Sequence, residues 1–245
     1  MPPTPADVLA RMVAGDPGRP RVTFYEDTPG GTQGERIELS AKVLANWVSK
    51  AANALQDEWD LGPGSVVRLD LPAHWRALYW ALAVWSVGAT VLLDEGPCDL
   101  LVTAAPAATP AEAAPAPRDA VPVVVVTLPA LARTAAAPLP PGTMDEAREL
   151  ATYADQFAAL SDPGPTDPAV VGHGWSAAYD EVVPHRDWDR GTRVHIRGDD
   201  LPRLLEASLA AWAVDGSVVV SRGPEPRGGR AERLASEGVT VDLTA

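Results

Sequence analysis

Short apolar runs alternate with helical segments along most of this chain, and this alternation restricts the fold more than any other feature. The runs are mainly Val, Leu and Ile and occupy residues 66–71, 89–94, 99–103, 121–127, 169–171, 193–196, 217–220 and 239–243. Strands that are buried on both faces have this composition, and strands that alternate with helices pair in parallel. The sequence therefore predicts an α/β fold with two packed, mostly parallel sheets flanked by helices.

Residues typical of helix ends mark where the intervening helices begin and stop. Ser40 stands at the N-cap of a helix that ends before Gly62, and Pro72 opens a second helix that Gly88 closes. The second helix is apolar over much of its circumference, so we expect it to be buried. Further helices are predicted over residues 5–14, 201–212 and 229–237.

Two local patterns give more specific expectations. Residues 21–26 and 36–39 have β-type sequences separated by turn-forming residues, which predicts a hairpin. The segment Thr143-Met-Asp-Glu matches a capping box, in which a hydroxyl and a carboxylate three residues later cap the first helical turn. We therefore expect a helix from Thr143 to about Leu160.

Composition along the chain indicates two subdomains. We place a first α/β subdomain at residues 1–130 and a second at 131–245, with sheets over residues 20–130 and 160–245. Ala/Pro-rich stretches near 104–118 and 134–142 have little to bury, so we expect them to be surface segments.

Charge and targeting signals exclude several classes of function. Acidic residues outnumber basic ones 33 to 20, and the lysines are limited to Lys42 and Lys50, so nucleic acid and anionic membranes are not predicted partners. Cys98 is the single cysteine, which fits a reducing compartment. The N-terminus lacks a basic start and an apolar core, and no apolar stretch is long enough to cross a bilayer. These features predict a cytoplasmic protein, and the bias towards Ala, Pro and Arg is associated with high-GC bacterial genomes.

The order of elements resembles the N-terminal region of the acyl-adenylate-forming (AMP-binding) ligase superfamily, which includes acyl-CoA synthetases, nonribosomal adenylation domains and luciferases. Leu39-Ser-Ala-Lys-Val-Leu and Ala51-Ala-Asn-Ala-Leu are similar to the family's "L-T-Y-x-E-L…N-R-L-A-x-A-L". Leu61-Gly-Pro-Gly-Ser-Val-Val-Arg-Leu-Asp-Leu-Pro resembles "G-V-x-P-G-D-R-V-A-I-x-L-P-N". Trp85-Ser-Val-Gly-Ala-Thr-Val-Leu-Leu-Asp resembles "L-K-A-G-A-x-Y-V-P-L-D" without its Pro.

The end of the chain continues the resemblance. The segment from Leu204 to Val220 is similar to the family's "L-L-E-A-L-L-A-P-L-L-A-G-G-T-V-V-L", and Glu237-Gly-Val-Thr-Val is similar to "Y-G-V-T-V". Together these matches cover most of the chain in the family's order. They imply a truncated, degenerate, actinobacterial-type homologue with ATP, AMP or CoA as candidate ligands.

The chain departs from the family at the loop that grips ATP phosphates. The family has a loop of the type "T-S-G-T-T-G-x-P-K-G", whose small residues let backbone amides approach phosphates while the Lys adds charge. The corresponding segment here is Gly172-His-Gly-Trp-Ser, without the Thr/Ser run or the Lys. The resemblance makes Gly172, His173, Gly174 and Ser176 a relic phosphate-loop position. Short Gly patterns arise often by chance, which favours a plain tight turn.

Other candidate sites are not supported by spacing. The histidines His74, His173, His185 and His195 do not have metal-ligand spacing, and with Cys98 they make no zinc pattern. His195 alternates with apolar neighbours on a strand, so we expect it to face solvent or a loop. Ser176, His173 and Asp180 are close in sequence, but no Gly-x-Ser-x-Gly elbow supports a hydrolase. We therefore predict no catalytic residue and no metal ligand.

Three functions remain open. The first is a non-catalytic protein, a pseudoenzyme that binds an unknown protein partner or small ligand on a ligase-like scaffold. The second is a residual nucleotide- or CoA-binding module, which a positive pocket at Arg193, Arg197, Arg222 or Arg227 beside the Gly172 loop would favour. The third is an adenylate-forming enzyme completed by a separate chain, because the regions that hold adenine and the catalytic Lys of the family would lie beyond residue 245.

Overall fold

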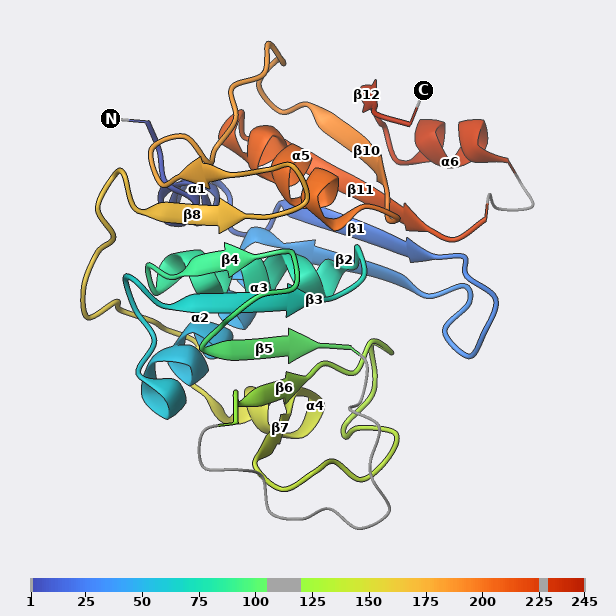
Figure 1. The fold of residues 1–245 in the computed structure, drawn as a ribbon. Helices are drawn as coiled ribbons and strands as arrows, with labels where there is room; N and C mark the ends of the chain where they lie inside the picture. Colours follow the sequence, from blue (N-terminus) through green and yellow to red (C-terminus); the bar gives the residue numbers. More distant parts are fainter. Residues whose placement is uncertain (1, 105–119, 225–228, 245) are drawn as a thin grey trace. The chain divides into compact units, whose positions relative to one another are not determined.

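The computed structural model describes residues 2–104, 120–224 and 229–244 (Figure 1). It confirms the predicted α/β class, with two mostly parallel sheets and flanking helices. The Ala/Pro-rich stretch near 104–118 falls almost entirely outside the described residues. The stretch at 134–142 is described and forms loop and turn rather than helix or strand.

The chain divides into two compact units, and each is assembled from segments that are distant in sequence. A five-stranded unit comprises Met1–Asn46, Pro72–Tyr79 and Asp180–Ala245, and a seven-stranded unit comprises Trp47–Leu71 and Trp80–Tyr179. This division differs from the expected 1–130 and 131–245. It differs because the N-terminal strands pair with strands near the C-terminus rather than with those that follow them in sequence.

The five-stranded unit has the strand order β12-β10-β11-β1-β2. Its strands are β1 (Pro20–Glu26), β2 (Arg36–Ser40), β10 (Arg193–Arg197), β11 (Ser217–Arg222) and β12 (Val241–Asp242). The predicted hairpin is confirmed, since β1 and β2 pair antiparallel, while the other pairs are parallel. Its helices are α1 (Pro5–Gly15), α5 (Leu201–Ala213) and α6 (Arg230–Ser236).

The two faces of this sheet differ in polarity. Because side chains alternate between faces along a strand, the register places Val22, Val194 and Val218 on one face and Thr23, His195 and Val219 on the other. The first face is apolar and buried, and α5 packs on β10 and β11 with its own Leu and Trp side chains buried. The second face carries most of the polar side chains of the sheet: Thr23, Tyr25, Arg193, His195, Arg197, Ser217, Ser221 and Asp242.

The seven-stranded unit has the strand order β7-β6-β5-β3-β4-β8-β9, and all pairs except β8–β9 are parallel. Its strands are β3 (Val66–Asp70), β4 (Thr90–Leu92), β5 (Leu100–Thr103), β6 (Val123–Val125), β7 (Thr143–Asp145), β8 (Pro168–Val171) and β9 (Ala177–Ala178). Helices α2 (Ala41–Trp59) and α3 (Trp75–Ser86) each begin in a segment of the other unit. The expected burial of α3 is confirmed, since its residues 77–85 are all buried.

The helix expected from Thr143 to Leu160 is wrong. Thr143 belongs to strand β7, and only α4 (Glu146–Glu149) and a 3₁₀ turn (Leu150–Thr152) follow it. Thr143 lies opposite Val123 in the sheet, so it does not take the N-cap position, and α4 begins after Asp145, which makes no side-chain capping hydrogen bond. Pairing with β6 therefore overrides the local capping signal.

Beyond the 3₁₀ turn, the chain is held by the side chains of one face of α2. Lys50, Asn53 and Gln56 recur every three residues along that face. Lys50 Nζ donates to the carbonyls of Ala151 and Tyr153, and Asn53 Nδ2 donates to those of Ala154 and Gln156. Gln56 Oε1 accepts from the Leu160 amide at 3.1 Å. These side chains satisfy backbone groups that a helix would otherwise pair internally, so the segment after Thr152 does not need to be helical.

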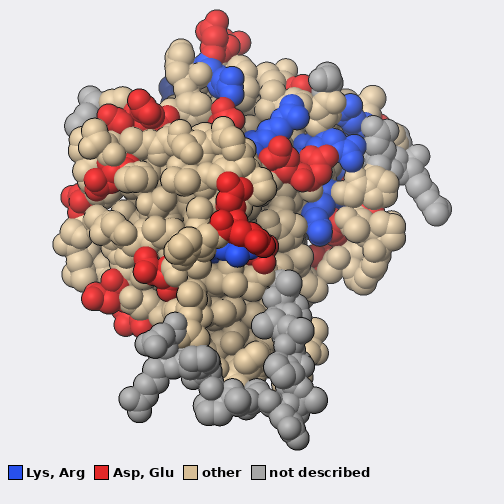
Figure 2. All heavy atoms as spheres, viewed as in Figure 1, with Lys and Arg blue, Asp and Glu red and all other residues tan. Residues whose placement is uncertain are grey.

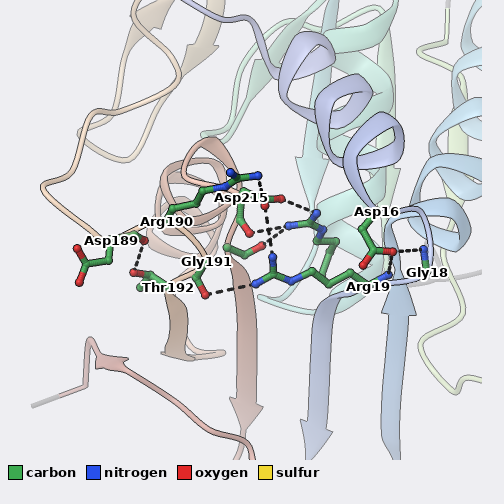
Figure 3. A network of polar contacts seen from close by, with 10 residues as sticks. Asp16, Gly18, Arg19, Asp189, Arg190, Gly191, Thr192 and Asp215 are labelled. Carbon is green, nitrogen blue, oxygen red and sulfur yellow. Dashed lines mark hydrogen bonds and ion pairs between the residues drawn. The ribbon is translucent and has the colours of Figure 1, made fainter.

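A buried arginine joins the N-terminal strand to the C-terminal part of the five-stranded unit. The Arg21 side chain is fully buried and donates to the carbonyls of Asp215 and Gly216 at 2.8 and 3.0 Å and to Asp215 Oδ1 at 2.7 Å. Arg19 and Arg190 also contact Asp215 (Figure 3). Burial alone would raise the pKa of Asp215, but its arginine partners outweigh burial, so the pKa lies below the ordinary 3.8.

We expect the substitution Asp215→Asn to destabilise the protein by about 1–3 kcal/mol at pH 7, because a buried guanidinium loses its ionised partner. Asn tolerates the left-handed backbone of this position, where φ is 59°, so the change isolates the charge. Since the folded-state pKa is depressed, the contribution is complete above pH 3.8 and disappears as the pH falls through the folded value. Urea unfolding at pH 7 and pH 3 measures both effects.

Asp189→Asn is the matched control, because the Asp189 carboxylate points away from Asp215 in Figure 3. Equal stability losses in the two variants, or a loss in Asp215→Asn that is unchanged at pH 3, would contradict the assignment.

Candidate functional site

The predicted loop, residues 172–176, leaves the carboxyl end of β8 and leads into β9. Gly172, His173 and Gly174 all have left-handed backbones, with φ of 121°, 49° and 75°. The Trp175 amide donates to the Gly172 carbonyl at 3.0 Å, which closes a tight turn. The sequence-based expectation of a turn is confirmed, and Ser176 lies at its end, directly before β9.

A carboxylate already occupies the inner side of this turn. Asp94, just after β4, accepts a hydrogen bond from the His173 amide at 3.1 Å, and its Oδ1 lies 3.3 Å from His173 Nε2. A Cβ atom at Gly172 would lie 2.7 Å from the Asp94 amide nitrogen, so only glycine permits this approach. The loop therefore presents its amide to the protein's own anion.

This arrangement differs from a phosphate cradle in its charge and in having an amide that is already hydrogen-bonded. A phosphate loop needs free backbone amides and a cation, whereas here the His173 amide is taken and a negative charge lies beside it. The loop contains no Lys or Arg. Among the residues that the structure describes, no cluster of His, Cys, Asp and Glu that could hold a metal ion is found.

A second polar site lies at the carboxyl ends of β10, β11 and β1, in the five-stranded unit. A small pocket there is lined mainly by polar side chains: Asp27, His195, Arg197, Ser221, Arg230 and Arg233. In open α/β sheets, ligands bind at this edge. Sequence analysis missed this site, because its residues come from four separate segments and match no short motif.

His195 is the centre of this site, and the expectation that it faces solvent or a loop is wrong. Its side chain is 2% exposed. Its Nδ1 lies 3.0 Å from Asp242 Oδ1, and its Nε2 lies 3.1 Å from Ser221 Oγ. Burial lowers the pKa of His195 below 6.5, although Asp242 acts in the opposite direction. Asp242 itself has a lowered pKa, because hydrogen bonds from His195, Thr244 and Arg230 outweigh its burial.

Helix α6 and the residue after it cover this polar face through charged contacts. Arg230 pairs with Asp242 Oδ2, and Arg233 makes two contacts to the Asp27 carboxylate. The Arg233 guanidinium also lies over the Tyr25 ring, 4.0 Å from its centroid, and its Nη1 is 3.3 Å from Ser221 Oγ. The helix has no buried residue of its own, so charge pairing rather than apolar packing holds it in place.

Glu237 is the anchor of this cover. It accepts hydrogen bonds from Tyr25 Oη at 2.5 Å, from Arg193 at 2.5 Å and from Arg36 at 3.0 Å. Burial alone would raise the pKa of Glu237, but the hydrogen bonds from Tyr25, Arg193 and Arg36 outweigh burial, so the net shift is downward from 4.5. Figure 2 shows Lys and Arg atoms gathered beside Asp and Glu atoms on this part of the surface.

The arginines expected to form a positive pocket are mostly paired. Arg193 is bound to Glu237, Arg197 to Asp199 and Arg222 to Glu26, and Arg227 lies outside the described residues. These three pairs lie in the five-stranded unit, while the Gly172 loop lies in the other unit.

Comparison with solved structures identifies the fold as that of the N-terminal part of acyl-CoA synthetases and adenylation domains. An acyl-CoA synthetase from Brucella canis matches 98% of this chain with a TM-score of 0.68 and 17% sequence identity. NpsA from Klebsiella oxytoca, in complex with 3-hydroxyanthranilyl-AMSN, also matches 98% of this chain, with a TM-score of 0.64 and 15% sequence identity. The N-terminal domain of FACL13 from Mycobacterium tuberculosis matches with 0.65 and 12%. The chain spans about half the length of the first two, 47% of each, and 62% of the third.

A curated relative gives the family. A TIGR03089 family protein from Mycobacterium tuberculosis strain H37Rv is 34% identical over 247 aligned positions, which cover 95% of each chain. The chain belongs to the TIGR03089 family. No protein-family model matches the sequence. Within the described residues, no helix is both long enough and apolar enough to span a bilayer.

We expect Glu237→Gln to loosen α6 at pH 7, because three charge-assisted hydrogen bonds lose their anion. Amide hydrogen exchange of α6 should accelerate about tenfold or more. Since the pKa of Glu237 is lowered in the folded protein, wild-type α6 should be fully docked above pH 4.5 and loosen as the pH falls below it. Glu232→Gln, on the exposed side of the same helix, is the control, and equal acceleration in both variants would contradict the anchor role.

Proposed function

We propose that this protein does not carry out acyl adenylation and that it uses the adenylation-type scaffold to bind a protein partner or a small ligand. The observation that carries the proposal is the loop after β8: it contains no Lys or Arg, and its His173 amide donates a hydrogen bond to the Asp94 carboxylate at 3.1 Å. This loop is where the resemblance places the phosphate grip. A ligase needs positive charge there, because adenylation builds negative charge on the carboxylate and the phosphate.

Electrostatic repulsion makes binding of a nucleoside triphosphate at this loop unfavourable. A phosphate oxygen placed at the His173 amide would lie within a few ångströms of the Asp94 carboxylate, and like charges at that distance cost several kcal/mol. His173 is the one side chain of residues 172–176 that can carry positive charge, and its ring faces the same carboxylate. Removing Asp94 as a competitor is therefore the direct way to test the proposal.

A residual nucleotide- or CoA-binding role is the second candidate. It is supported by the position of the loop at the carboxyl end of a parallel strand and by its run of left-handed residues, both of which suit close approach of a ligand to the backbone. A thermal-shift experiment with nucleotides separates the two candidate functions, because a ligand that binds only the native state raises the unfolding free energy by about 2.7 kcal/mol at a hundredfold excess over its Kd.

We expect no thermal shift of the wild-type protein with ATP, AMP, CoA or a non-hydrolysable acyl-AMP analogue, each with Mg²⁺, and no pyrophosphate exchange with mixed carboxylic acids. Asp94→Asn should admit anions and produce a measurable shift with ATP. Glu95→Gln is the matched control, since it removes the same charge from a neighbouring side chain that is 93% exposed.

A wild-type shift with one nucleotide would favour the residual binding module and direct further work to residues 172–176. ATP-dependent turnover by the wild-type chain, alone or with a separately supplied adenylation-type C-terminal chain, would overturn the proposal.

A further inference from the structure

We propose that Ser221, His195 and Asp242 form a nucleophile, base and carboxylate that hydrolyse a small carboxylic ester or thioester. The inference goes beyond the proposed function, since it concerns a different reaction in a different unit. It stands on geometry: Ser221 Oγ lies 3.1 Å from His195 Nε2, and His195 Nδ1 lies 3.0 Å from Asp242 Oδ1. A catalytic triad is recognised by this geometry, in which the nucleophile is hydrogen-bonded to the base and the base to an orienting carboxylate, whatever the order of the three residues in the chain.

The proton positions in this chain of contacts follow from the acceptors. A carboxylate only accepts, so the proton on neutral His195 lies on Nδ1 and points to Asp242. The lone pair of Nε2 then faces Ser221, whose hydroxyl donates to it. Asp242 is held in place from its other side, because Arg230 binds Oδ2 and Thr244 donates to Oδ1 from its amide and its hydroxyl. The tautomer is therefore the one that a general base needs.

Burial, with a smaller contribution from nearby arginines, keeps the pKa of His195 below its ordinary value. The groups that face it are Asp242 from β12, Ser221 from β11, and Arg230 and Arg233 from α6; Arg193 and Arg197 lie on its own strand. Burial and the two arginines of α6 lower its pKa, and Asp242 raises it, with a net shift below 6.5. A base that is neutral at pH 7 can take the Ser221 proton.

Arg233 provides the positive charge that the reaction requires. Its Nη1 donates a hydrogen bond to Ser221 Oγ at 3.3 Å, so its positive charge lies beside the atom that attacks the carbonyl group. Two contacts to Asp27 and the Tyr25 ring fix its guanidinium before any substrate arrives. A donor that needs no rearrangement stabilises an oxyanion most effectively.

The pocket also limits the substrate. Ser221 and His195 both line it, so the nucleophile and the base are reachable, and Ser221 is half-buried. Gly223 closes its rim: its φ is 92°, and a Cβ there would lie 2.3 Å from the Thr28 amide nitrogen. The enclosed space is only about 20 Å³, room for about one water molecule, so the acyl group of a substrate has to lie at the mouth of the pocket, beside its guanidinium and carboxylate groups.

The reaction balances without a cofactor. Ser221 Oγ attacks the carbonyl carbon, its proton moves to His195 Nε2, and Arg233 faces the oxyanion. The bond to the leaving alcohol or thiol breaks as that group takes the proton from His195. Water then attacks the acyl-serine while His195 Nε2 takes a proton from it; the acyl–Oγ bond breaks, Ser221 Oγ takes that proton back from His195, and the carboxylic acid leaves.

The test uses the full chain with diisopropyl fluorophosphate and with p-nitrophenyl acetate. We expect one phosphoryl group per chain, located on Ser221 by peptide mass spectrometry, as fluoride leaves. Ser221→Ala should abolish the label and reduce ester hydrolysis to the background rate, and His195→Gln should slow labelling by about 100-fold or more. Ser217→Ala, on the same strand and the same face of the sheet, should label like the wild type.

The pH profile distinguishes a working base from a structural histidine. Labelling should be constant near pH 7 and fall as the pH drops through the His195 pKa, below 6.5, because protonated Nε2 cannot accept the proton. Asp242→Asn, a positioning change, should slow labelling and move this limb to lower pH, since the carboxylate raises the pKa of His195. Absence of label, label on another serine, or equal labelling of Ser221→Ala would overturn the proposal. None of these outcomes depends on nucleotide binding.

Discussion

The parallel pairing of β1 with β11 is the constraint on which the five-stranded unit depends. It joins strands from opposite ends of the chain. The other strands lie outside this pair, with β10 and β12 on the β11 side and β2 on the β1 side. Such a distant contact has a large loop-closure cost before it contributes anything. The buried Arg21 offsets part of that cost, because its guanidinium binds two carbonyls and a carboxylate in the turn that starts β11, 194 and 195 positions away.

The same pairing creates the polar face. Parallel strands are usually apolar on both sides, yet here one side carries Arg193, His195 and Ser221, and it is covered by the charged residues of α6. Burying ions costs more than burying Leu or Val, and replacing buried ion pairs by apolar residues often stabilises a protein. A sheet face kept polar at this cost, with its groups in a defined hydrogen-bond order, is better explained by a chemical or binding role than by stability.

The sequence correctly predicted the helices and strands in which local periodicity and tertiary packing favour the same structure. The helix predicted between Ser40 and Gly62 forms α2, and the helix predicted over residues 201–212 forms α5. Prediction from the sequence failed where contacts with residues distant in the chain determine the local structure. Thr143 has the start of a helix signal but pairs with β6, and residues 153–160 form no helix because side chains of α2 supply hydrogen-bond partners for their backbone. His195 shows the same limit: alternation places it on a face, but the partners on that face come from β12, β11 and α6, which no local pattern connects.

The two polar sites lie at the same kind of position, the carboxyl end of parallel strands, but their polar groups have different partners. In the loop after β8, the protein's own carboxylate takes the His173 amide, and no Lys or Arg of that loop remains to attract an anion. At the end of β11, the carboxylates of Asp27 and Asp242 are bound by Arg233 and Arg230, and the hydroxyl of Ser221 is left facing a histidine nitrogen and a guanidinium. One arrangement closes a binding position from within, whereas the other leaves a nucleophile next to a base. The proposed absence of adenylation therefore does not imply the absence of all chemistry, because Asp94 and the loop after β8 belong to one unit and the groups that order Ser221 belong to the other.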